Sequence, residues 1–93
     1  MINTFEDLFE KMRLTGHDPH RLMAMHEEHR HWKAQSEQHH GTNNLTAYVR
    51  LQMCRENLLG YLACLQDTAY ICQSEYDRLW SSLDLTEKEQ YEQ

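Results

Sequence analysis

Seven histidines lie between residues 17 and 40, and the rest of the 93-residue chain has none. His26 and His29 are three residues apart, a spacing that places two imidazoles on one face of a helix and allows them to bind one transition-metal ion such as zinc. His40, or the same pair from a second copy, would supply further ligands. The zinc-protease pattern is not met, because Arg30 stands four residues after His26. Metal binding through His26, His29 and His40 is therefore one hypothesis for this segment.

Two other interpretations of the histidine-rich segment stay open. Full protonation would move the formal charge from -6 to about +1, and a like-charged helix face would then weaken an interface at low pH. Alternatively, the histidines are ordinary residues of a half-buried helix face. Catalysis is disfavoured, because the sequence contains neither a nucleophile elbow nor a glycine-rich phosphate loop. We predict that the protein is not an enzyme.

The histidines must be positioned by helices, since strand patterns are nearly absent. The first helix is predicted from Thr4 as N-cap to Gly16 as the left-handed C-terminal residue, with an apolar i, i+3, i+4, i+7 stripe. Asp18-Pro19 is a strong helix start, so the second helix is expected from Pro19 to about His40. Its inward face is expected to include His26, His29 and His40.

A third helix is predicted from about Asn44 to Leu83, because one apolar stripe stays in phase over that whole length. Its members are Tyr48, Leu51, Cys54, Leu58, Leu59, Leu62, Leu65, Ala69, Cys72, Tyr76, Leu79, Trp80 and Leu83. A break near Gly60 or near Asp67-Thr68 is the alternative. The predicted fold is all-α, a three-helix elongated hairpin or bundle over residues 1–83 that dimerises. Residues 84–93 are predicted to be an acidic tail, or a short helix that frays.

The start of the long helix has more apolar surface than the second helix can cover. In an antiparallel hairpin it would face residues 33–40, where Ala34 is the one apolar side chain. Unpartnered apolar surface of this kind favours association with another chain. The predicted interaction residues are Leu45, Tyr48, Val49, Leu51 and Met53, and the predicted partner is a second copy or another protein.

Composition excludes several other classes of function. No block of Lys or Arg is present to neutralise phosphates, so nucleic-acid binding is disfavoured. No segment is apolar and long enough for a membrane span, and no secretory signal is recognisable, so we expect a cytoplasmic protein without a membrane partner. Three cysteines in such a compartment are expected to be small buried residues without disulfides.

These observations lead to one functional prediction and one alternative. We predict a non-enzymatic protein–protein interaction module without a cofactor, such as an adaptor, a chaperone-like partner or a small inhibitor of a larger complex. The alternative is a transition-metal-binding or metal- and pH-sensing helical protein that uses the histidine-rich helix.

Overall fold

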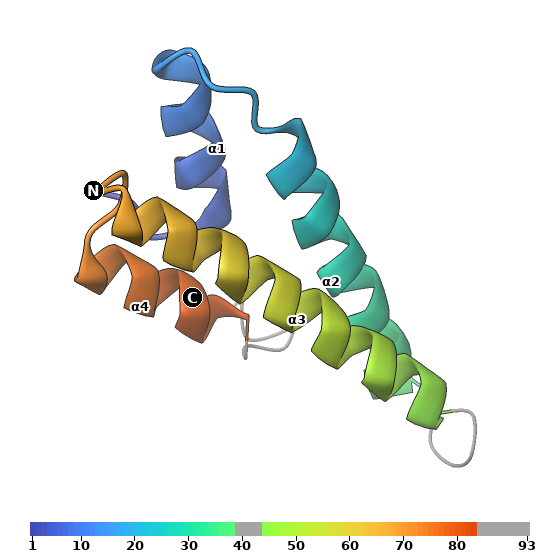
Figure 1. Ribbon diagram of the computed structural model, residues 1–93. Helices are drawn as coiled ribbons and strands as arrows, with labels where there is room; N and C mark the ends of the chain where they lie inside the picture. Colours follow the sequence, from blue (N-terminus) through green and yellow to red (C-terminus); the bar gives the residue numbers. More distant parts are fainter. Residues whose placement is uncertain (39–43, 84–93) are drawn as a thin grey trace.

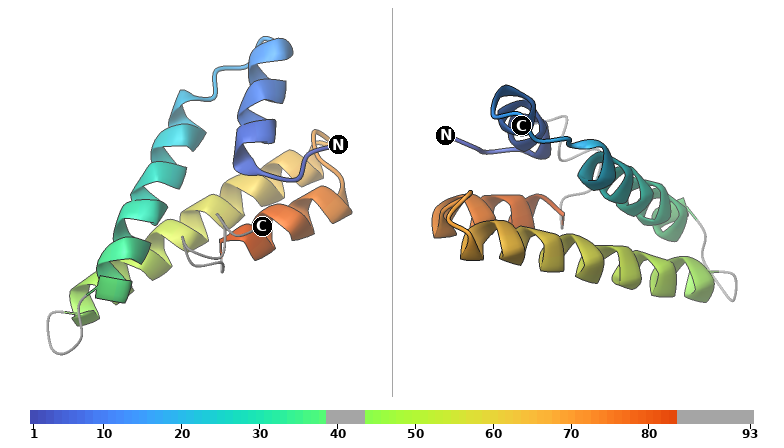
Figure 2. Two further views of the ribbon diagram at one scale, coloured as in Figure 1. Left: turned by 180° about the vertical axis from the view of Figure 1, so that it is seen from behind. Right: turned by 45° about the horizontal axis from the view of Figure 1, so that its top comes forward.

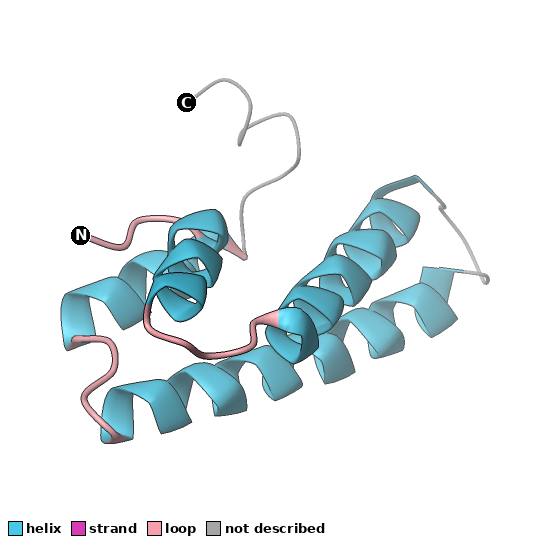
Figure 3. Cartoon of the chain, turned by 90° about the horizontal axis from the view of Figure 1, so that it is seen from above, coloured by secondary structure: helices cyan, strands magenta, loops and turns pink. Residues whose placement is uncertain are grey.

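The computed structural model describes residues 1–38 and 44–83, and these form four helices with no strand among them. They are α1 (Phe5–Leu14), α2 (His20–Gln38), α3 (Asn44–Asp67) and α4 (Gln73–Ser82) (Figure 1). The long helices α2 and α3 run in opposite directions and contact each other most extensively. The short helices α1 and α4 both lie toward the end of this pair that is far from residues 38–44 (Figures 2 and 3).

The predicted ends of α1 are confirmed. The Thr4 hydroxyl accepts a hydrogen bond from the Asp7 backbone N–H at 3.1 Å, and the Asp7 carboxylate accepts one from the Thr4 N–H at 3.2 Å. This capping box satisfies backbone donors that the first turn of a helix leaves unpaired. Gly16, at φ +82°, follows the helix in the left-handed conformation.

The start of α2 also follows from its sequence. The Asp18 carboxylate accepts a hydrogen bond from the His20 backbone N–H at 2.9 Å, which is the expected N-cap interaction. Helix α2 is described to Gln38, so the end predicted near His40 lies outside the described residues, as does the tail at 84–93.

The hydrophobic core lies where α1 and α4 close against the far end of the α2–α3 pair. Its five fully buried large side chains come from all four helices, and they are Leu8, Leu22, Leu58, Leu62 and Leu79. The core also takes apolar side chains from outside the helices, because Ile2 and Ile71 are 4% and 2% exposed.

The prediction of one continuous helix from about Asn44 to Leu83 is wrong. Helix α3 ends at Asp67, the alternative break near Asp67-Thr68, while Gly60 lies within it. Ala69 takes a left-handed conformation at φ +63°, and the backbone N–H groups of Tyr70 and Ile71 both donate to the Leu65 carbonyl. The chain thereby reverses, and α4 returns alongside α3 (Figure 1).

This reversal also corrects part of the predicted stripe. Ala69 and Cys72, which were expected on the core face, are exposed. Ile71, which lay outside the stripe, is buried instead. Of the three cysteines, Cys54 is buried as expected, but Cys64 and Cys72 are exposed.

Because of the reversal, an alanine-to-glycine substitution should have opposite effects on the free energy of unfolding at Ala69 and at Ala63. A left-handed conformation disfavours any residue with a Cβ atom, so Ala69→Gly is expected to raise the free energy of unfolding by up to about 1 kcal/mol. The matched change Ala63→Gly, inside α3, is expected to lower it by about 0.5–1 kcal/mol. Urea unfolding followed by circular dichroism measures both. A loss of stability in both variants would indicate that α3 continues through residue 69.

Candidate interaction surface

Four large apolar side chains are exposed on consecutive turns at the start of α3. Leu45 is 68% exposed, Tyr48 54%, Val49 48% and Met53 52%. We call these four residues the tip patch, because they lie where the α2–α3 pair extends beyond α1 and α4 (Figures 1 and 3). All four were predicted interaction residues. The fifth, Leu51, is half-buried and lies outside the patch.

Small residues occupy the side of this helical segment that is buried. Ala47 and Cys54 are 5% and 8% exposed, and they are seven residues apart on one face of α3. Cys54 lies near Glu28 of α2; burial in the helix interface and this carboxylate both raise the pKa of its thiol. Small side chains therefore face α2 here, while larger apolar ones face outward, the reverse of the usual amphipathic arrangement.

Helix α4 packs against α3 as far as Arg55. The Arg55 guanidinium lies 4.5 Å from the centre of the Trp80 ring, near the last turn of α4. On α2, the Lys33 ammonium donates a hydrogen bond of 2.8 Å to the Leu83 carbonyl. The nearest residue of the tip patch, Met53, is two residues before Arg55 on α3, and the patch extends away from these contacts.

Covering the exposed apolar surface of the tip patch would contribute a sizeable favourable free energy. Complete burial of a Leu, Val or Met side chain contributes about 1.5–3 kcal/mol relative to exposure, so covering four half-exposed side chains would contribute on the order of 5 kcal/mol. A chain of this size has a small total stability, so this amount is significant. The arrangement favours binding of another apolar surface.

The structure places the predicted metal ligands in different surroundings. His29 is buried at 2% exposure, whereas His26 is half-buried beside α1. His40 lies outside the described residues. Within residues 1–38 and 44–83, no group of three or more His, Cys, Asp or Glu side chains is arranged to hold a metal ion. The metal hypothesis for His26, His29 and His40 stays a prediction.

His26 has a structural role that its sequence position did not reveal. Its imidazole stacks on the Phe5 ring, with 4.3 Å between ring centres, and meets the Phe9 ring edge-on at 5.9 Å. It therefore helps to hold α1 against α2. Burial lowers the pKa of His26 and Arg30 lowers it further, against the opposing charges of Glu6 and Glu27.

None of the described helices is long and apolar enough to cross a membrane. Comparisons of the chain with protein-family profiles, with curated proteins and with solved structures gave no match.

The stacked imidazole predicts a pH dependence of stability. Because the pKa of His26 is lower in the folded protein than its ordinary value of 6.5, the unfolded chain binds more protons in this range. The free energy of unfolding is therefore expected to fall as the pH falls through 6.5, and His26→Phe should reduce this fall while keeping the aromatic contact. Urea unfolding at several pH values between about 5 and 8 measures both proteins. The control His31→Gln, at an exposed histidine, should behave as the wild type. Parallel curves for wild type and His26→Phe would contradict the assignment.

Proposed function

We propose that this chain is a non-enzymatic protein-interaction module that binds a partner helix on the tip patch. The observation that carries the proposal is the exposure of Leu45, Tyr48, Val49 and Met53 on consecutive turns of one helix. Exposed and contiguous apolar side chains of this kind typically mark protein-binding surfaces. A helix laid along the patch would be recognised through apolar side chains at i, i+3, i+4 and i+7 spacing.

A second copy of the chain is the partner that the geometry favours. At the other end of the α2–α3 pair, α1 and α4 pack beside these two helices, whereas the described part of the tip is formed by α2 and α3 (Figure 3). Two tips packed together would give the same number of helices there. A four-helix bundle formed by two helical hairpins buries both apolar faces in one core.

The spacing of the patch residues suits a two-fold axis. Leu45, Val49 and Met53 follow one another at intervals of four residues, so they are symmetric about Val49. Antiparallel pairing about this residue would set Leu45 of each copy against Met53 of the other, as an isologous interface requires. The four patch residues carry no charge, so the net charge of -6 does not act directly at the contact.

The size of the patch limits the expected affinity. Four side chains of this size, about half exposed, present roughly 400 Å² in each copy. A dimer that buries twice this area would lie below the roughly 1,200 Å² of standard stable interfaces. We therefore expect association in the micromolar range or weaker, with the partner exchanging rapidly.

The proposal predicts that one charge in the patch separates the copies. Val49→Glu places a carboxylate at the proposed axis, and it should weaken self-association by about tenfold or more. Because Val49 is exposed in the single chain, the substitution should change the free energy of unfolding by less than about 0.5 kcal/mol. Light scattering and sedimentation over a concentration series measure the association. Leu14→Glu is the matched control, since Leu14 is 78% exposed on α1 and lies outside the patch.

Two outcomes would contradict parts of the proposal. Equal weakening by Val49→Glu and Leu14→Glu would show that the tip patch is not the interface. A wild-type chain that stays monomeric at the highest soluble concentration would exclude a second copy as the partner. A photoreactive residue at position 48, compared with one at position 14, would then test whether another protein occupies the patch.

A further inference from the structure

A pocket of about 470 Å³ lies at the other end of α3 from the tip patch. Four segments meet there: the end of α1, the turn before α2, the last turns of α3 and the connection to α4. Its volume is within the range of small-molecule sites, which is about 300–1,000 Å³. The pocket depends on the chain reversal after α3, because Tyr70 in that connection forms one of its walls.

The Tyr70 wall is held by contacts with three residues at the end of α1 and the turn after it. The Lys11 ammonium donates to the Tyr70 carbonyl and lies 4.4 Å from the centre of its ring. The Tyr70 hydroxyl shares a hydrogen bond with the Thr15 hydroxyl, and the His17 ring meets the Tyr70 ring edge-on at 5.3 Å. A wall fixed in this way loses little conformational freedom when a ligand binds.

The lining combines an apolar floor with aromatic rings and one carboxylate. Met12 is buried and Leu65 is half-buried, and together they supply the apolar part. Tyr61 and Tyr70 add aromatic rings. Asp18 adds a carboxylate at the rim, and the hydrogen bond from the His20 N–H lowers the pKa of that group, so it is ionised at neutral pH.

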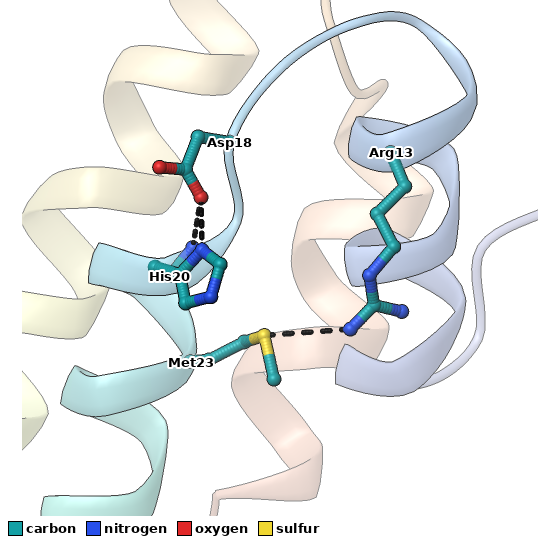
Figure 4. A network of polar contacts seen from close by, with 4 residues as sticks. All are labelled: Arg13, Asp18, His20 and Met23. Atoms are coloured by element: carbon teal, nitrogen blue, oxygen red, sulfur yellow. Dashed lines mark hydrogen bonds and ion pairs between the residues drawn. The ribbon is translucent and has the colours of Figure 1, made fainter.

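The Asp18 carboxylate keeps capacity for a ligand. One of its oxygens accepts from both the backbone and the ring nitrogen of His20, while the other makes neither contact (Figure 4). Nearby, the Arg13 guanidinium of α1 lies against the Met23 sulfur of α2 at 3.6 Å (Figure 4), and neither of these residues lines the pocket. The free carboxylate oxygen is therefore not matched by an arginine in the lining.

We propose that this pocket binds a small organic cation that carries an apolar ring. Its ammonium group would lie beside the Asp18 carboxylate, which adds a charge-assisted hydrogen bond, and near the Tyr61 ring, because the Lys11 ammonium already lies against the Tyr70 ring. Its apolar ring would pack on Met12 and Leu65. The net charge of -6 favours cations over anions near the surface. This site is separate from the tip patch and does not rest on the proposed interaction function.

The test compares two probes of the same shape and opposite charge, 2-phenylethylammonium and phenylacetate. Titration followed by amide chemical shifts should give a dissociation constant on the order of 1 mM or below for the cation, with shifts at His17, Thr68 and Tyr70. Asp18→Asn keeps an N-cap oxygen for α2 but removes the charge, and because this carboxylate is exposed to solvent it should weaken cation binding by about three- to fivefold. Asp77→Asn, at an exposed carboxylate of α4 outside the lining, should leave binding unchanged.

Three results would overturn the proposal. The first is equal binding of the anion and the cation, and the second is equal binding by wild type and Asp18→Asn. The third is the absence of shifts at the pocket amides at about 10 mM probe, well above the expected constant. A folded spectrum for Asp18→Asn, compared with that of the wild type, ensures that weakened binding does not reflect unfolding.

Discussion

The Glu75 carboxylate fixes the arrangement on which the other features depend. One of its oxygens accepts a hydrogen bond of 3.0 Å from the Cys72 N–H and so caps α4, while the other accepts one of 2.9 Å from the Ile2 N–H. These two backbone donors lower the pKa of Glu75 to about 2, so the carboxylate is ionised and both hydrogen bonds are charge-assisted. Arg78 completes the clamp by donating to the Ile2 carbonyl at 3.2 Å. The start of the chain is thereby tied to the start of α4, and both Ile2 and Phe5 enter the core.

This clamp explains why the two ends of the α2–α3 pair differ. It brings α1 and α4 to the same end, where the leucine core is complete and the pocket forms (Figure 2). Helix α4 has ten residues, so its last turn reaches Arg55 and leaves the first turns of α3 uncovered. Helix α2 adds small and polar residues such as Ala34 and Ser36 there, which bury little apolar area. Among the described residues, the exposed tip therefore follows from the short length of α4 beside the longer α3.

Local signals in the sequence predicted both ends of α1 and the start of α2, while tertiary contacts determine where α3 ends and α4 begins. The Thr4 capping box, Gly16 and Asp18-Pro19 each act within a few residues, so they are recognisable without the fold. The reversal after Asp67 was missed as the main prediction because the apolar stripe stays in phase across it. The interaction residues were predicted from a mismatch in composition; four of them are exposed in the structure, and Leu51 is half-buried. The pocket could not be predicted, since it needs Tyr70 beside His17, a pairing that the reversal creates.

Helix α1 takes part both in the contact with His26 and in the pocket, whereas the tip patch lies away from α1. Its Phe5 and Phe9 rings stack with His26, while Met12 and the turn after it line the pocket. Protonation of His26 would weaken the aromatic contact, because a charged imidazole loses hydration when buried. We therefore expect acidification to loosen α1 and with it the pocket. The tip patch contains no histidine, so association through it should respond less. Cation binding at the pocket and self-association through the tip patch can each be measured over a pH series. Equal pH responses of the two would contradict the expectation that acidification affects the pocket more than the tip patch.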